Sequence, residues 1–258
     1  MKFDVLSKDH VAAPLAQEIL GCMKWSTYDQ FNWLLEDVLG SMGRPITSPP
    51  PEEARDHIFR MAGMYAEAVI ASPPFMDVLG PLYMEIGSHG MRKQMAQFFT
   101  PWHIASLMSR ITLGTDHQQI SDDELVRVGE PCAGSGVMLL ACCDSVLTQF
   151  GPEALRRYSL TAIDLDRTCT LMTATQLLAN CAIHDVAIGE VLVYHGNSLA
   201  VEEYEVIVHA SDANAPPATK IPARDPGRLA AAKDLAKQNP QLALFGDGHI
   251  EEDITTTS

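Results

Sequence analysis

A run of small residues between two apolar stretches is the part of the sequence best suited to chemistry. The apolar segment 126–130 ends in Glu130, and Pro131-Cys132-Ala133-Gly134-Ser135-Gly136 separates it from the apolar segment 137–140. This pattern predicts a short buried strand, a turn and the start of a helix. Backbone N–H groups at a helix N-terminus bind small polar molecules, and glycine allows the close approach and positive φ of such a turn. The turn could also serve only to pack a helix on a strand.

Three later apolar segments also end in polar residues. The four expected strands cover residues 126–130, 160–166, 191–195 and 205–209. Asp164 lies near the end of the second, where nucleotide-binding folds place an acid that hydrogen-bonds ribose hydroxyls. A helical segment over 171–182 comes before the third, which Gly196-Asn197-Ser198 follows. Strands that alternate with helices predict a parallel, doubly wound α/β sheet with its ligand at the C-terminal ends of the strands.

The first hundred residues show helical spacing of apolar positions and no obvious chemistry of their own. Helices are expected over 10–42, 53–71 and 75–86, with proline-containing loops between them. Thr100 is a suitable N-cap and Pro101 a suitable first helical residue. A further helix is therefore expected from this point to about Leu113.

The composition changes again from Pro216 onward, where prolines and charged or polar residues predict a weakly ordered tail. We therefore expect a helical subdomain over 1–96, a cofactor-binding α/β domain over 97–215 and a C-terminal tail over 216–258.

The net charge of −15 argues against a broad, non-specific grip on nucleic acid. Any contact with DNA would come from a local basic patch or from a partner. The six cysteines form neither a Cys-x-x-Cys pair nor a zinc-finger spacing, which favours free thiols and no metal site. No signal peptide and no apolar run of about 20 residues is evident, so we expect a soluble, cytoplasmic protein that does not contact a membrane.

Four elements together resemble the S-adenosylmethionine-dependent N6-adenine DNA methyltransferases, especially the modification subunits of type I restriction systems. The resemblance runs from about Met76 to Val208. Gln97-Phe98-Phe99-Thr100-Pro101 is similar to the Phe-Tyr-Thr-Pro element that lines the cofactor pocket in that family. The segment 130–136 is similar to its methionine-binding loop. Asp164 falls at the family's ribose-binding acid, and Gly196-Asn197-Ser198-Leu199 at the element that meets the adenine ring.

The resemblance implies a Rossmann-like S-adenosylmethionine-dependent methyltransferase fold, truncated after the fourth strand, with an N-terminal helical subdomain. It implies S-adenosylmethionine as the cofactor and methylation of adenine N6 in DNA as the activity, in restriction-modification. The implied cofactor-binding residues are Phe99, Thr100, Pro101, Glu130, Pro131, Cys132, Ala133, Gly134, Ser135, Gly136, Asp164, Leu165, Asn197 and Ser198.

The sequence departs from the family at the catalytic element, which is Asn/Asp-Pro-Pro-Tyr/Phe directly after the fourth strand. There the polar side chain binds the target amine and the aromatic stacks on the flipped adenine. This chain has Ala210-Ser211-Asp212-Ala213 instead, and Asn214-Ala215-Pro216-Pro217 just downstream has the wrong spacing. Ser72-Pro73-Pro74-Phe75 fits a related pattern but is interpreted as a helix-breaking loop. No catalytic residue is therefore assigned.

Three functions remain open at this point. The first is an adenine-specific DNA methyltransferase, or a subunit of one, with a degenerate catalytic loop. The second is an inactive methyltransferase-like protein that regulates a partner in restriction-modification or anti-restriction. The third is a small-molecule methyltransferase or another nucleotide binder, which the Phe-Thr-Pro element disfavours. The family sheet has three further strands, so a partner subunit, a second copy in an oligomer or the tail would have to cover the edge of the fourth strand.

The tail contains Gln241-Leu242-Ala243-Leu244-Phe245, which resembles the peptide that docks bacterial replication proteins on the DNA sliding clamp. The resemblance implies that Gln241 enters a small polar pocket, while Leu242, Leu244 and Phe245 contact the clamp through apolar groups. The same residues could instead form a strand that covers the open sheet edge. In the clamp interpretation, this acidic chain reaches DNA through a partner rather than through its own charge.

Overall fold

The computed structural model describes residues 5–88, 99–113, 125–200, 204–213 and 215. Its helices are α1 (Ala13–Gly21), α2 (Thr27–Ser41), the 3-10 helix η1 (Glu52–Ala54), α3 (Arg55–Ile70), α4 (Leu79–Ser88), α6 (Trp102–Leu113), α7 (Val137–Phe150), α8 (Pro152–Leu155) and α9 (Arg167–His184). Its strands are β1 (Val126–Glu130), β2 (Tyr158–Asp164), β3 (Glu190–His195) and β4 (Glu205–Ser211). None of these helices combines the length and apolar character needed to cross a bilayer.

The four strands form one mixed sheet in the order β1-β2-β3-β4. The first three are parallel, as predicted, but β4 runs antiparallel to β3. The prediction of a wholly parallel sheet was therefore wrong at the fourth strand. The reason is the connection between β3 and β4, which covers only the nine residues 196–204. A parallel pair needs a crossover of about a dozen residues or more, whereas an antiparallel pair closes with a short loop.

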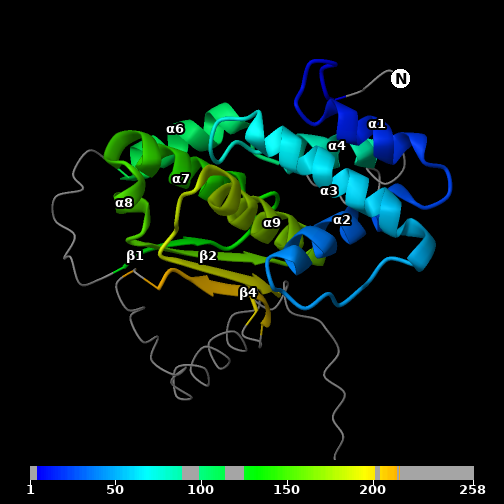
Figure 1. The fold of residues 1–258 in the computed structure, drawn as a ribbon. Coiled ribbons are helices and arrows are strands. Elements are labelled where there is room, and N and C mark those ends of the chain that lie inside the picture. Colours follow the sequence, from blue (N-terminus) through cyan, green and yellow to red (C-terminus); the bar gives the residue numbers. More distant parts are fainter. Residues whose placement is uncertain (1–4, 89–98, 114–124, 201–203, 214, 216–258) are drawn as a thin grey trace, which may run out of the picture.

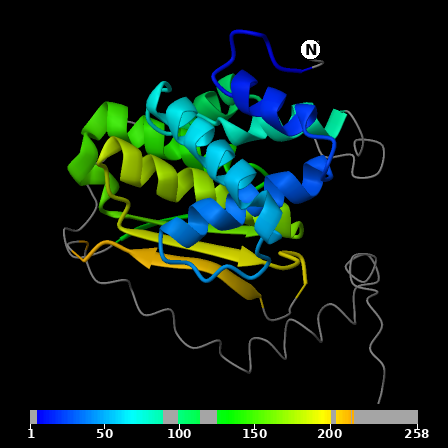
Figure 2. The same ribbon diagram turned by 45° about the vertical axis from the view of Figure 1, so that its right-hand side comes forward.

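The described helices lie on one face of the sheet (Figures 1 and 2). The predicted doubly wound arrangement, with helices on both faces, is thus not present in the described part of the chain. Helix α9 is central: it packs on β2 and β3 on one side and on α2 and α3 on the other. Helix α6 packs along α7 at the end of the molecule near β1.

One hydrophobic core joins the helical layer to the sheet. It contains fully buried side chains from α2 and α3, such as Leu34 and Ile58, together with Leu160 and Val193 from the sheet. Most of α9 is buried around its circumference because both layers cover it. The division of the chain near residue 96 stays a prediction, since both sides of it contribute to the same core.

The loop after α3 confirms one interpretation of the sequence. Ser72-Pro73-Pro74-Phe75 ends the helix, as expected, and the Ser72 hydroxyl donates to the Ala68 carbonyl oxygen at 2.8 Å. Phe75 is completely buried, and its backbone N–H donates to Asn180 Oδ1 at 2.6 Å. Its ring is therefore not available to stack on a base.

Helix α6 begins one residue later than predicted. The Pro101 carbonyl oxygen accepts hydrogen bonds from the N–H groups of Ile104 and Ala105, at 2.9 and 3.1 Å. Pro101 therefore stands just outside the helix, and Trp102 is the first helical residue. The end of the helix at Leu113 agrees with the prediction.

Candidate cofactor-binding site

The three parallel strands bring their C-terminal residues to one edge of the sheet. Asp164 at the end of β2 is in register with His195 at the end of β3, and Glu130 at the end of β1 is in register with Ala162. The loops that follow these strands therefore lie next to one another. This is the edge at which a parallel α/β sheet holds its ligand.

The loop after β1 has a backbone shape that requires glycine at two positions. Gly134 and Gly136 adopt positive φ values of 57° and 86°. A Cβ on Gly136 would lie 3.0 Å from Thr173 Cγ2 and 3.2 Å from Thr173 Cα, and one on Gly134 would lie 3.0 Å from Phe99 Cδ1. Any other residue would thus be strained and would displace its neighbours. Helix α7 begins directly after the loop, at Val137.

Asp164 connects the second strand to this loop. Its Oδ2 accepts a hydrogen bond from the Gly134 N–H at 2.7 Å, and its Oδ1 accepts one from the Asp166 N–H at 2.9 Å. Each carboxylate oxygen has further lone pairs and can accept more than one hydrogen bond. The carboxylate is half-buried, so a ligand at the sheet edge can still reach it.

The Phe-Thr-Pro element lies against the glycine loop, although it is about thirty residues away in sequence. The closeness of Phe99 to Gly134 shows this directly. The Phe99 ring stacks on Tyr83, with ring centroids 5.7 Å apart and an angle of 30° between the planes. Thr100 is half-buried and Pro101 is exposed. The fold thus brings together the two pocket elements that the sequence predicted.

The remaining residues of the loop after β1 divide into two groups. Ala133 and Ser135 are the buried residues of the loop. Pro131 and Cys132 are exposed. The Glu130 carboxylate accepts a hydrogen bond from the Cys132 N–H at 3.0 Å, so it holds the turn directly after the strand.

The residues predicted to meet the adenine side lie after β2 and β3. The Leu165 side chain is 71% exposed beside Asp164. Asn197 and Ser198 are half-buried. The Asn197 Oδ1 accepts a hydrogen bond from the Leu199 N–H at 3.0 Å, which orders the loop after β3.

A buried polar network below the glycine loop was not predicted from the sequence. The Asp77 carboxylate accepts hydrogen bonds from the Ser135 hydroxyl, the Gly80 N–H and the Gln176 amide, each at 2.8 Å. Gln176 also donates to the Ser135 carbonyl oxygen at 2.8 Å and accepts from the N–H groups of residues 78 and 79. Burial raises the pKa of Asp77 above its usual value, while these hydrogen bonds lower it. The one available signal was an acid within an apolar stretch.

The loop after β4 lies at the opposite edge of the sheet. Because β4 is antiparallel, Ser211 is in register with Glu190 at the start of β3. The Asp212 N–H donates to the Gly189 carbonyl oxygen at 3.0 Å, and the Asp212 carboxylate pairs with Arg156. Along β3 the two edges are roughly 16 Å apart. Asp212 is therefore remote from the glycine loop.

Several predicted residues lie outside the described part of the chain. These are Gln97 and Phe98 of the segment 97–101, Asn214, and the tail residues Gln241, Leu242, Leu244 and Phe245.

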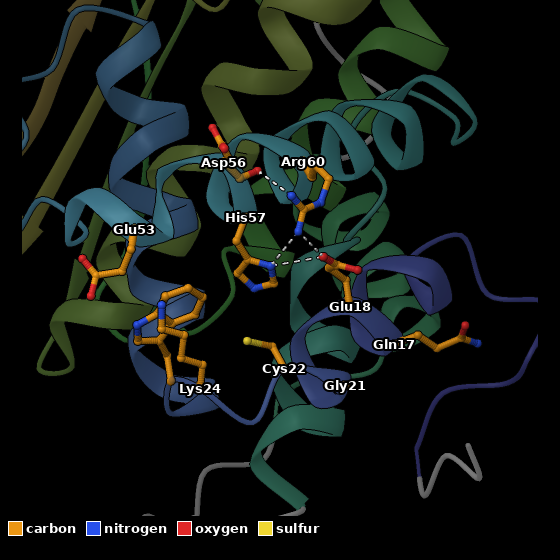
Figure 3. Close-up of a pocket in the computed structure, with 10 residues that line it drawn as sticks. Gln17, Glu18, Gly21, Cys22, Lys24, Glu53, Asp56, His57 and Arg60 are labelled. Carbon is orange, nitrogen blue, oxygen red and sulfur yellow. Dashed lines mark hydrogen bonds and ion pairs between the residues drawn. The ribbon is translucent and has the colours of Figure 1, made fainter.

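A separate cavity of about 470 Å³ lies among the N-terminal helices (Figure 3). His57 Nδ1 and Arg60 Nη2 each lie 3.1 Å from Glu18 Oε1, and His57 Nε2 lies 2.7 Å from Gln30 Oε1. The His57 ring also packs on Trp25, with centroids 5.5 Å apart. These groups satisfy one another, so they point to no particular ligand.

The family of the chain follows from comparison with known proteins. A solved structure of a class I S-adenosylmethionine-dependent methyltransferase from Listeria monocytogenes is similar at 12% identity, with a TM-score of 0.42. The similarity covers 75% of this chain and 55% of that one, so this chain spans about half the length of the solved relative. None of the curated proteins matches. The family model described as N-6 DNA Methylase matches residues 75–223, which is more than half of the chain. The chain therefore belongs to the N-6 DNA methylase family.

Proposed function

We propose that the chain binds S-adenosylmethionine at the edge formed by the ends of β1, β2 and β3. The observation that carries this proposal is the hydrogen bond from the Gly134 N–H to Asp164, which places a carboxylate directly against a glycine loop at a helix N-terminus. Both glycines occupy positions where a Cβ would collide with neighbouring residues. Both glycines also have positive φ, so the loop has a shape that favours glycine, and backbone N–H groups at a helix N-terminus bind small polar ligands.

In the proposal, different residues at this edge bind different parts of the cofactor. The loop over Gly134 and Gly136 holds the methionine part, and Asp164 accepts hydrogen bonds from the ribose hydroxyls. Leu165 and Asn197 lie on the adenine side. The remaining contributors are Phe99, Thr100 and Pro101 from the Phe-Thr-Pro element, the other residues of 130–136, and Ser198. When bound, the cofactor supplies an activated methyl group.

Calorimetric titration of the purified chain with S-adenosylhomocysteine tests this proposal. We expect saturable binding at one site per chain. Adenosine alone should bind more weakly, because it lacks the amino-acid part that the glycine loop would hold. The absence of saturable binding would overturn the cofactor assignment, and equal affinity for adenosine would overturn the role of the loop.

In the proposal, the chain is a subunit of a DNA adenine-N6 methyltransferase that acts in restriction-modification with a partner. The family membership supports methyl transfer to DNA. Two observations support the need for a partner. Asp212 lies at the edge away from the glycine loop, paired with Arg156, and the segment 210–213 has no aromatic residue. The net charge of −15 is also unsuited to holding DNA over a broad surface.

The purified chain is therefore expected to transfer little or no methyl group to DNA by itself. Stacking of a flipped base on an aromatic side chain contributes roughly 1–3 kcal/mol, and the described loop after β4 offers no such group. Labelled S-adenosylmethionine and unmodified DNA of mixed sequence, with and without extract from the host cell, provide the measurement. Transfer only in the presence of extract supports the subunit role. Robust turnover by the purified chain contradicts it.

The same assay distinguishes the second candidate, an inactive regulatory protein. The position of the loop after β4, at the edge away from the glycine loop, favours this candidate as well. Such a protein would keep the cofactor edge but lack a catalytic loop beside it. In that case the chain binds cofactor but adds no transfer activity to any extract. It would instead alter the activity of a methyltransferase already present.

The tail supports a further partner within the proposal, the DNA sliding clamp. Gln241, Leu242, Leu244 and Phe245 are the contact residues. Pro240 before the motif and Gly246 after it both suit a short docking peptide. Docking on a clamp would place an acidic chain on DNA without a basic surface of its own.

Titration of a labelled peptide spanning residues 237–249 with purified clamp, followed by fluorescence anisotropy, is expected to show saturable binding. Burial of a leucine and a phenylalanine contributes roughly 1.5–3 kcal/mol each, less the cost of ordering the peptide, which predicts a Kd on the order of micromolar. Leu244→Ala and Phe245→Ala should remove binding. Gln238→Ala, outside the motif, is the matched control. Binding that is indifferent to the first two changes would contradict the clamp proposal.

A further inference from the structure

His195 occupies a position that connects the cofactor edge to β4. It is the last residue of β3 and is in register with Asp164 on one side and with Glu205 on the other. The backbone next to it is also tied to β2, because the Gly196 N–H donates to the Asp164 carbonyl oxygen at 3.0 Å. The side chain is 31% exposed, so it lies at the margin of the proposed site rather than in the core.

The two ring nitrogens of His195 contact two acceptors. Nε2 lies 3.1 Å from the Leu165 carbonyl oxygen, and Nδ1 lies 3.1 Å from Glu205 Oε2. A carbonyl oxygen and a carboxylate can only accept hydrogen bonds. Both bonds therefore form together when the ring carries both protons, and its positive charge then faces the negative charge of Glu205.

The bond to Leu165 acts on a residue that packing does not hold. The Leu165 side chain is 71% exposed, whereas the strand residues before it are largely buried. Leu165 also stands between Asp164, the proposed ribose ligand, and Asp166, whose N–H bonds to Asp164 Oδ1. Fixing the Leu165 carbonyl oxygen thus limits the movement of the turn that presents the Asp164 carboxylate.

Glu205 is itself held from the helical layer. Arg167 at the start of α9 has its Nε 3.8 Å from Glu205 Oε1, and its Nη1 lies 3.1 Å from Glu36 Oε1. Glu36 belongs to α2 and is almost completely buried. A series of charged contacts therefore runs from the buried helical layer through Arg167 and Glu205 to His195. It exists because β4 pairs antiparallel with β3 and so places Glu205 beside the cofactor edge.

We infer that His195 is a positioning residue that holds the turn 164–166 in the shape needed to bind the cofactor. The inference rests on the proposed cofactor site, which it deepens by adding a residue that acts through Leu165. His195 itself need not touch the cofactor. Its effect is to reduce the number of conformations that the turn adopts before binding, which improves affinity.

The same pair of strands contains a matched control. His209 on β4 has its Nε2 3.2 Å from Glu190 Oε1, so it forms a contact of the same kind at the opposite edge of the sheet. Replacement of either histidine by alanine removes one contact between an imidazole and a carboxylate from the β3–β4 pair. Only the replacement of His195 also releases the Leu165 carbonyl oxygen.

His195→Ala is expected to weaken the binding of S-adenosylhomocysteine about fivefold, the loss that corresponds to one net hydrogen bond. His209→Ala should leave the affinity unchanged, because it removes a contact with Glu190 and leaves the Leu165 carbonyl oxygen bound to His195. His195→Gln should recover most of the affinity, because its side-chain amide can donate to the Leu165 carbonyl oxygen. Unchanged affinity in His195→Ala, or an equal loss in His209→Ala, would overturn the inference.

Hydrogen exchange on the ligand-free full chain separates this inference from the proposed function. In His195→Ala the Asp166 amide should exchange faster than in the wild type, because its bond to Asp164 depends on an ordered turn. In His209→Ala its exchange should match the wild type. Faster exchange together with a failure of the wild type to bind cofactor would reject the proposed function but keep the positioning role of His195. Unchanged exchange in His195→Ala would reject the positioning role whether or not cofactor binds.

Discussion

Alanine in place of Asp77 is expected to lower the free energy of unfolding by about 3 kcal/mol or more. The change leaves the Ser135 hydroxyl, the Gly80 N–H and the Gln176 amide without their acceptor in a buried place. Each buried donor without a partner costs about 1–3 kcal/mol. Relief of the buried carboxylate offsets part of this sum. Denaturant unfolding of wild type and variant, followed by circular dichroism, measures the difference. A loss below about 1 kcal/mol would contradict the structural role of the network.

Asp77→Asn is the conservative variant for the same network. Its amide oxygen can keep the bonds from Gly80 and Gln176, and its amide nitrogen can donate to the Ser135 hydroxyl oxygen. This variant should therefore be at least as stable as the wild type at neutral pH, because it keeps these hydrogen bonds without a buried charge. It also covers the case in which Asp77→Ala does not fold. A large loss in Asp77→Asn would show that the negative charge itself is required.

The difference in stability between Asp77→Asn and the wild type should depend on pH with a definite sign. Burial raises the pKa of Asp77, so the folded protein binds this proton more tightly than the unfolded chain does. The contribution of Asp77 to stability is then fully present below about pH 4, the ordinary pKa of the group. It declines as the pH rises through the higher value of the folded state. Asp77→Asn lacks this decline, so its stability relative to the wild type should increase as the pH rises above about 4.

Asp164→Ala is expected to weaken the binding of S-adenosylmethionine or S-adenosylhomocysteine at least tenfold. A hydrogen bond from a ribose hydroxyl to a charged carboxylate contributes roughly 1.5–3 kcal/mol, and about 1.4 kcal/mol is a tenfold change. The variant also loses the acceptor of the Gly134 N–H, so the glycine loop becomes less ordered before binding. Calorimetry measures the affinity, and circular dichroism checks that the fold is intact.

Asp166→Ala is the matched control for this measurement. Asp166 lies two residues further on and caps α9, where its Oδ1 accepts a hydrogen bond from the Thr168 N–H at 2.8 Å. Loss of this cap should cost about 1 kcal/mol of stability with little effect on affinity. Equal binding by Asp164→Ala and the wild type would contradict the ribose role of Asp164. An equal loss in both variants would show that the order of the turn, rather than the carboxylate of Asp164, determines affinity.

The sequence alone predicted the loops that meet at the proposed cofactor edge, because the features that indicate them are local. Gly134 and Gly136 are needed at positive φ whatever surrounds them, and apolar runs that end in Glu130 and Asp164 indicate strands that end together. The parallel pairing of the first three strands followed from the helices between them. The family resemblance agrees with the match of the family model over residues 75–223.

The direction of the fourth strand follows from the length of the loop before it, although the alternation of strands and helices predicted a parallel strand. Nine residues between β3 and β4 are too few for a crossover, so the antiparallel pairing could have been predicted from the loop length alone. The antiparallel direction of β4 places Asp212 at the far edge of the sheet and Glu205 next to His195. The residues of the loop after β4 showed the departure from the family's catalytic element, whereas the position of that loop at the far edge of the sheet follows from the strand direction.

Only the tertiary structure decided which distant polar groups meet. The bonds of Asp77 and Gln176 join residues about a hundred positions apart, and no local pattern encodes such a pairing. Phe75 is buried rather than exposed for the same reason, since its N–H meets Asn180 on α9. Helices, turns and caps are determined locally because their hydrogen bonds lie within a few residues. Contacts between layers depend on how the whole chain packs, and here that packing placed the helical layer directly beneath the glycine loop.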